Sequence, residues 1–163
     1  MNPRFEFNEV TSLEEMVVND VAIVGTPNTF SYYALGNKPK QDKYPYYIAG
    51  INVEVSFDET KMYAYSLDEI AKLQIIKNLS GFYSIYNTVN KSYLYNYISD
   101  THYDIGYKVP SGEYGSSEWI ITKEKEGFTF YGVNDPYLDI SSQTTFLGVK
   151  EKPSMPLRVY SFS

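Results

Sequence analysis

Few residues in this sequence carry obvious chemistry, and they are widely spaced. The only His lies in Asp100-Thr101-His102-Tyr103-Asp104, where two carboxylates and the imidazole occupy alternate positions. Alternate side chains of an extended segment lie on one face, so this segment could hold a divalent ion, although a solvated polar loop has the same composition. The chain has no Cys, which excludes disulfides, thiolate metal sites and Cys nucleophiles. We therefore predict no metal site.

Motifs typical of catalysis are also missing from the sequence. It contains no Gly-x-Ser-x-Gly nucleophile elbow, and its ten Gly form no Gly-x-Gly-x-x-Gly phosphate loop. The acidic residues are scattered, although a carboxylate pair assembled only by the fold stays open as an alternative. We predict no catalytic residue and no cofactor, and an enzyme is the third hypothesis behind two binding roles.

Aromatic residues are the unusual feature of the composition. Eighteen Tyr, nine Phe and one Trp make up 17% of the chain, and Tyr stands beside Asn or Asp in several predicted turns. A sugar ring stacks its C–H face on an aromatic ring while nearby Asp or Asn side chains accept its hydroxyls. The alternative is that these Tyr are ordinary strand formers, some of them facing a core. The predicted ligand-binding residues are Tyr46, Tyr95, Tyr97, Asp100, Asn134, Asp135 and Tyr137.

Charge and hydropathy limit the partners and the location. Fourteen basic and twenty acidic residues give a formal net charge of −6, which argues against a nucleic-acid partner. The segment Met1–Val10 lacks the features of a secretory signal, and apolar runs such as Val21–Val24 are too short for membrane insertion. We expect a place inside the cell or within a particle, unless the chain is a mature fragment of a secreted protein.

The elements that would position these residues are predicted to be mostly strands. The chain has 163 residues, 43% of them hydrophobic, which fits one globular domain. Short segments rich in aromatic and β-branched residues, bounded by Gly, Asn, Asp, Pro and Ser, are typical of strands. Only Ser12-Leu13-Glu14-Glu15 and Ser66-Leu67-Asp68-Glu69 look helical, and both have the spacing of a capping box. They predict two short helices, the second near Leu67–Lys72.

An internal repeat organises the predicted strands. In two units a strand beginning at Leu73 or Trp119 is followed eight residues later by Gly81 or Gly127. An aromatic strand then follows, Phe82–Tyr86 or Phe128–Gly132, and next a Tyr-Leu pair that ends at Leu94 or Leu138. A looser unit with an insertion at Ser56–Ile70 precedes them. We predict one domain over residues 1–163, with a strand and short helix in 4–17 and repeats over 20–77, 81–123 and 127–162.

Three such units of four strands indicate a barrel around a pseudo-threefold axis, because one unit alone cannot bury an apolar face. The fourth strands of the units are predicted at Leu73–Ile76, Trp119–Ile121 and Leu157–Tyr160. The equivalent core positions are predicted to be Leu35, Leu94 and Leu138.

At these residues the sequence resembles a β-trefoil of the ricin-B-like kind. The matching motifs are Tyr83-Ser84-Ile85 with Asn87, Tyr137-Leu138-Asp139-Ile140 and Trp119-Ile120-Ile121. The order of segments is also similar to repeat domains appended to secreted and surface proteins of Bacteroidetes. Sugar-binding members have Gln two residues before the Trp, whereas this chain has Ser117, so a galactose-type site does not carry over.

The resemblance implies an all-β fold of the β-trefoil type and a recognition function without catalysis. The partner would be a glycan or a protein surface, bound by loops on a rigid barrel. The alternative is a structural or decoration protein of a larger assembly, such as a phage virion, for which Tyr-rich faces would suit permanent interfaces or oligomer contacts.

Overall fold

The computed structural model describes residues 5–25, 33–37, 50–52, 55–58, 61–64, 70–99, 102–109, 112, 114–134, 136–140, 148–153 and 155–162. Strands dominate this part of the chain and pair antiparallel, so the predicted all-β class is confirmed. The strands are β1 (Phe5–Val10), β2 (Asp20–Gly25), β3 (Tyr33–Leu35), β4 (Gly50–Asn52), β5 (Val55–Asp58), β6 (Lys61–Ala64), β7 (Leu73–Lys77), β8 (Tyr83–Asn87), β9 (Ser92–Tyr93), β10 (Tyr95–Ser99), β11 (His102–Gly106), β12 (Gly115–Ser116), β13 (Trp119–Lys123), β14 (Phe128–Gly132), β15 (Tyr137–Leu138), β16 (Gly148–Val149) and β17 (Arg158–Phe162).

The first predicted helix is present, whereas most of the second lies outside the described residues. Helix α1 (Leu13–Val17) is capped by Ser12, whose side-chain oxygen accepts the Glu15 N–H at 3.1 Å. Residues 65–69 of the second lie outside the described part of the chain. The residues that follow are extended, because Ile70 forms a bridge with Gly36 and the Ala71 N–H donates to the Leu35 carbonyl. The helix predicted near Leu67–Lys72 is therefore wrong at its described end.

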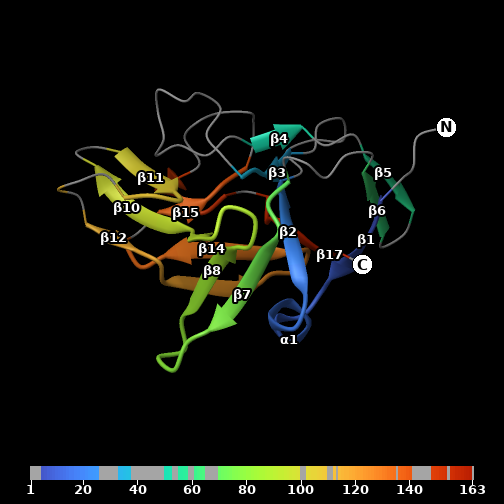
Figure 1. The fold of residues 1–163 in the computed structure, drawn as a ribbon, viewed down its shortest axis with the longest axis horizontal. Coiled ribbons are helices and arrows are strands. Elements are labelled where there is room, and N and C mark those ends of the chain that lie inside the picture. Colours follow the sequence, from blue (N-terminus) through green and yellow to red (C-terminus); the bar gives the residue numbers. More distant parts are fainter. Residues whose placement is uncertain are drawn as a thin grey trace.

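The described strands form two antiparallel sheets. The larger one runs as an open path from β16 to β5, and the smaller one has the order β11-β10-β12. The ladders of the described residues therefore form no closed barrel, although an isolated bridge between Phe128 and Leu157 links the start of β14 to the residue before β17. In Figure 1 the small sheet lies at one end of the molecule, and β1, β5 and β6 lie at the other.

Two hairpins, β7–β8 and β13–β14, have the same construction. Their strands share the burial patterns, alternating on β7 and β13 and almost continuous on β8 and β14. The pairs Gln74–Tyr86 and Ile120–Tyr131 occupy the same place in the two ladders. The equivalent of Phe128–Gly132 is thus Tyr83–Asn87, one residue later than the sequence alignment predicts. The turn of the β7–β8 hairpin has one residue more than the turn of β13–β14. Strand β8 therefore begins two residues after Gly81, whereas β14 begins one residue after Gly127.

The pair β17–β2 repeats this arrangement with strands from the two ends of the chain. Arg158 pairs with Val24 as Gln74 pairs with Tyr86. Neighbouring pairs of strands meet at three further contacts: Val21 with Leu73, Tyr83 with Trp119, and Phe128 with Leu157. Residues at matching places in these three pairs are called equivalent below.

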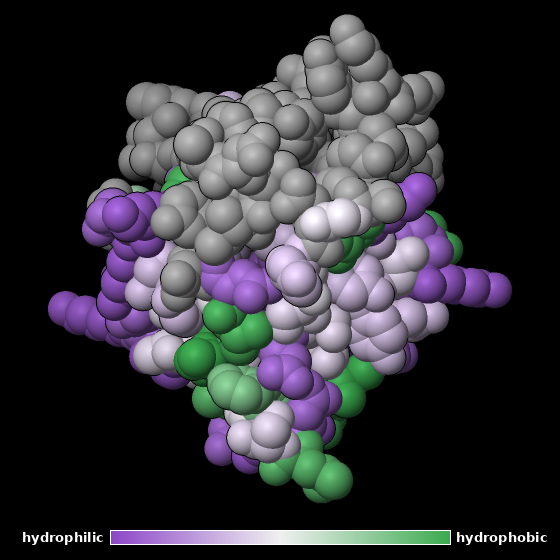
Figure 2. Space-filling view, turned by 90° about the vertical axis from the view of Figure 1, so that its left-hand side faces the viewer, coloured by the Kyte–Doolittle hydropathy of each residue, from purple (hydrophilic) through white to green (hydrophobic). Residues whose placement is uncertain are grey.

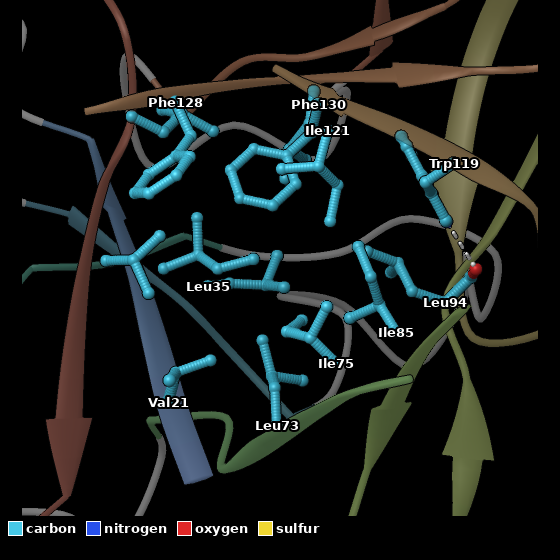
Figure 3. Packing of buried hydrophobic residues seen from close by; sticks show 14 of the residues in the cluster. Val21, Leu35, Leu73, Ile75, Ile85, Leu94, Trp119, Ile121, Phe128 and Phe130 are labelled. Carbon is cyan, nitrogen blue, oxygen red and sulfur yellow. Dashed lines mark hydrogen bonds between the residues drawn. The ribbon is translucent and has the colours of Figure 1, made fainter. Parts of the chain in front are cut away.

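The main core lies between these strands, as Figure 3 shows. Leu35, Leu94 and Leu138 are at most 1% exposed and belong to one cluster, which confirms the prediction that they are core residues. Trp119 is fully buried in the same cluster, and its indole N–H donates to the Leu94 carbonyl at 3.0 Å. A buried indole needs such a partner, because an unpaired polar group in the core is costly.

A second, smaller core cluster lies on the opposite face of β2 and β17. Strand β1 pairs with the edge of β17 and with β6, and β5–β6 is the hairpin formed by the predicted insertion. Strand β2 is consequently buried on both faces, which explains its continuous apolar run. The members of this cluster are Phe7, Ala22, Val24, Ala34, Met62, Ile70 and Tyr160.

Candidate functional site

Of the predicted ligand-binding residues, the structure brings Asn134 against β10, the strand of Tyr95 and Tyr97, through hydrogen bonds to Asn96. Tyr46, Asp100 and Asp135 lie outside the described residues. Tyr95 is half-buried on β10, whereas Tyr97 on the same strand is fully buried. In this structure the ring of Tyr97 is therefore closed to solvent, which counts against a role for Tyr97 in a shallow surface site.

Asn134 is used to hold the fold together. Its backbone N–H donates to the Asn96 side-chain oxygen at 3.0 Å, and its side-chain amide donates to the backbone carbonyls of Asn96 and Tyr114. Asn96 is fully buried, and its own amide donates to the carbonyls of Ser116 and Glu118. Both N–H groups of the Asn134 amide thus have protein partners, and the residue ties the turn after β14 to β10.

Tyr137 lies in an aromatic pair on the outer side of the strands. It stands opposite Tyr131 in the β14–β15 ladder, with ring centroids 4.6 Å apart and planes tilted by 45°. The equivalent residues of the preceding unit, Tyr86 and Tyr93, form the same cross-strand pair at 5.0 Å. Tyr93 is 38% exposed and the other three rings are half-buried. We call Tyr86–Tyr93 the first Tyr pair and Tyr131–Tyr137 the second Tyr pair.

The two Tyr pairs have different neighbours on β7 and β13. Exposed Gln74 stands opposite Tyr86, and Ile120, which is 40% exposed, stands opposite Tyr131. The first Tyr pair is therefore flanked by an amide and the second by an apolar side chain. Each can contact a ligand that has both an apolar face and hydroxyl groups.

An ion pair lies near the second Tyr pair. The Lys152 ammonium is 2.8 Å from the Glu124 carboxylate, which also accepts the Thr129 hydroxyl at 3.2 Å. The hydrogen bond from Lys152 holds the pKa of Glu124 below its usual range, although partial burial of the carboxyl opposes the effect. Lys152 also interacts electrostatically with Tyr137. The charges of Lys152 and Glu124 cancel each other, and Lys123 also acts electrostatically on Glu124.

A polar cluster joins the first two units. The Asn87 amide donates to the Asn37 side-chain oxygen at 2.9 Å, and the Tyr107 hydroxyl donates to the Gly36 carbonyl at 2.7 Å. Burial raises the pKa of Tyr107, and its hydrogen bond with the Asn87 side chain opposes that rise. These polar groups bind one another rather than solvent, so the cluster holds the two units together.

Sequence reasoning missed Tyr86, Tyr93 and Tyr131. The available signal was the alternation within the repeated strands, where Ile85 and Phe130 point to the core and the following Tyr must point outward. Attention to Tyr beside Asn and Asp in turns selected Tyr97 and Asn134 instead. The coloured part of the face in Figure 2 mixes purple hydrophilic residues with pale ones and with a smaller number of green hydrophobic residues.

In the part of the chain that the structure describes, no group of three or more His, Asp or Glu side chains is arranged to hold a metal ion. The same part contains no helix of the length and apolar character needed to cross a membrane. Comparison of the chain with protein-family models, curated proteins and solved structures found no match.

Proposed function

We propose that this chain is a non-catalytic recognition module with the β-trefoil arrangement, and that it binds a glycan through the second Tyr pair. The observation that carries the proposal is the recurrence of an outward-facing cross-strand Tyr pair at equivalent positions of two units. Cross-strand aromatic pairs also stabilise a sheet by themselves. Their recurrence on the outer side of two units additionally offers a ligand the same two rings in both places, and this supports a binding role.

Three contacts support the β-trefoil arrangement. Val21 with Leu73, Tyr83 with Trp119, and Phe128 with Leu157 each join the first and fourth strands of one predicted unit. The antiparallel pairs β7–β8, β13–β14 and β17–β2 each join the fourth strand of one unit to the first strand of another. Followed in order, these six contacts return to the strand from which they start, as a threefold arrangement requires.

The chemistry of the second Tyr pair supports a glycan as the ligand. Tilted rings offer both faces and edges to the C–H groups of a pyranose, and the Tyr hydroxyls can exchange hydrogen bonds with its hydroxyls. The neighbouring Lys152 and Glu124 neutralise each other, and the chain as a whole is acidic. A neutral sugar is therefore favoured over an anionic one.

Exposed apolar side chains favour one alternative, a structural or decoration role in a larger assembly such as a phage virion. Leu79 at the tip of the β7–β8 hairpin is fully exposed, and Ile76 and Ile120 are about 40% exposed. Apolar groups gathered at a surface are typical of protein interfaces. A protein surface would then replace the glycan as the partner.

A glycan array probed with the purified chain and three variants tests the proposal. We expect a reproducible glycan signal that weakens roughly tenfold, equivalent to about 1.4 kcal/mol, in Tyr137→Ala and Tyr131→Ala. Tyr114→Ala is the matched control, because Tyr114 is 89% exposed and lies outside both Tyr pairs. Circular dichroism of each variant checks that the fold persists.

Either of two results would contradict this proposal. A glycan signal that survives both Tyr137→Ala and Tyr131→Ala would place the ligand elsewhere. No glycan signal, together with a discrete protein complex lost on Ile120→Asp or Leu79→Asp, would favour the assembly role.

A further inference from the structure

We propose that the chain has a second glycan site, formed by Gln74, Tyr86 and Tyr93, and that its own N-terminal strand covers the third equivalent position. The chain then binds two molecules of a neutral pyranose, not one or three. This inference rests on the proposed function above, because both sites take the same class of ligand.

The geometry of the first Tyr pair matches that of the second. Tyr86 and Tyr93 are opposed across β8 and β9 as Tyr131 and Tyr137 are across β14 and β15. The ring centroids are 5.0 Å apart in one pair and 4.6 Å apart in the other. The same class of ligand therefore meets two aromatic rings at a similar spacing in both places.

The hairpins beneath the Tyr pairs also match in a polar detail. The Asn78 amide donates to the Ser84 hydroxyl at 3.2 Å, and the Thr129 hydroxyl donates to Glu124 at 3.2 Å. Ser84 and Thr129 are equivalent, and both are buried. Each hydroxyl is thus bound by its own hairpin, which leaves the ring pair as the common surface feature.

The third equivalent position is filled differently. Val24 and Ala34 stand opposite each other in the β2–β3 ladder, where the other units have Tyr. Both are fully buried in the second core cluster, beneath Phe7 of β1 and Met62 of β6. A ligand could reach this position only if β1 and β6 left the sheet.

The flanking residues predict that the two sites differ in selectivity. Gln74 supplies a neutral group that both donates and accepts hydrogen bonds, whereas Ile120 supplies only apolar contact. The site at Gln74 is therefore expected to distinguish sugars by a hydroxyl or acetamido group. The site at Ile120 is expected to distinguish them less.

Fluorine NMR of the full chain labelled with 3-fluorotyrosine tests the inference. The probes are the methyl glycosides of glucose, galactose, mannose and N-acetylglucosamine, added to millimolar concentration, and signals are assigned by single Tyr→Phe variants. We expect one sugar to shift the signals of both Tyr pairs, and Tyr93→Ala to abolish the shift at Tyr86 but not at Tyr131. Gln74→Ala is expected to change the sugar preference at the first Tyr pair alone.

Buried Tyr97 and exposed Tyr114 are the internal controls, and neither signal is expected to move. Shifts confined to Tyr131 and Tyr137 would overturn the second site and leave the proposed function standing. If no sugar shifts the signals of either Tyr pair, both the second site and the proposed function are overturned. A shift at Tyr160, which lies in the second core cluster, would overturn the covering of the third position.

Discussion

At the scale of single residues, each unit contacts the next through one equivalent residue, and the atoms that make this contact differ from unit to unit. The residue two places after each equivalent Leu, that is Asn37, Asn96 or Ile140, lies against the end of the first strand of the next unit. Asn37 accepts from the Asn87 amide, whereas Asn96 and the Ile140 carbonyl lie so close to a Gly that an added Cβ would collide with them. Those two glycines are Gly132 and Gly25. The three positions therefore share a close approach between two neighbouring units, although the residue types differ.

The Glu124–Lys152 pair gives a prediction at this scale. Because the pKa of Glu124 is lowered in the folded chain, the pair adds stability above the unfolded-state pKa and loses it as the pH falls through the folded-state pKa. In Lys152→Met we expect the Glu124 pKa to rise toward its ordinary value, measured by carbon NMR of the side-chain carboxyl. The difference in stability between wild type and variant should vanish at acid pH.

A Glu124 pKa that does not change in Lys152→Met would contradict the assignment of the shift to this ion pair. Lys125→Met is the matched control, since Lys125 carries the same charge next to Glu124, whereas among the described residues the ion pair of Glu124 is with Lys152.

At the scale of elements, the two equivalent hairpins differ mainly in their turns. Gly81 and Gly127 both have a φ near +90°, a backbone conformation that disfavours residues with a Cβ. A Cβ at Gly81 would meet open space, whereas one at Gly127 would collide with the Leu157 carbonyl. That carbonyl accepts the Phe128 N–H in the bridge between β14 and β17. At its Gly, the turn at Gly81 therefore packs against no other part of the described chain. The turn at Gly127 contacts Leu157, the residue before β17.

The two glycines make a matched pair of variants. We expect Gly81→Ala to lower the free energy of unfolding by about 1–2 kcal/mol through backbone strain alone. Gly127→Ala should lower it by about 1–3 kcal/mol more, because the bridge to Leu157 must shift. Urea unfolding of both variants measures the difference. Equal losses would mean that the close approach at Leu157 adds nothing to stability.

At the scale of the whole molecule, two core clusters share strands β2 and β17. Val21, Ile23 and Val159 face the main core, and the alternate residues Ala22, Val24 and Tyr160 face the second core cluster. The two strands are thereby held on both sides. Their position joins the N-terminal strand, the insertion hairpin and the repeated units into one body, as Figure 1 shows.

Trp119→Ala is the prediction that tests this packing. Trp119 is the largest fully buried side chain, and its indole N–H binds the Leu94 carbonyl of the same unit. We expect a loss of about 3–5 kcal/mol in the free energy of unfolding, measured by thermal and urea denaturation. Ile120→Ala, on the exposed side of the same strand, should cost far less. An unchanged melting temperature for Trp119→Ala would contradict the core shared by the units.

Local patterns in the sequence were sufficient for most elements. The capping box at Ser12 predicted α1, alternation predicted the hairpins beginning at Leu73 and Trp119, and the repeat predicted that Leu35, Leu94 and Leu138 are core residues. These features depend on neighbours along the chain and on period-two burial, which a sequence records directly. The same reasoning was wrong for the end of the helix predicted near Leu67–Lys72, because Ile70 and Ala71 pair with residues 36 and 35 instead of continuing a helix.

Alternation assigns the Tyr of the repeated hairpins to the outer side, but the tertiary structure decided the exposure of the aromatic residues elsewhere. Tyr95 and Tyr97 lie two residues apart among similar neighbours in the sequence, yet only Tyr97 is fully buried. The cover of Phe7 and Met62 over Val24 joins strands that are separated in the sequence. The sequence by itself determined a β-rich chain with a repeated hairpin and a Leu core, since these follow from local alternation. Exposure of a Tyr ring depends on the strands packed against it, and only the assembled fold specifies those.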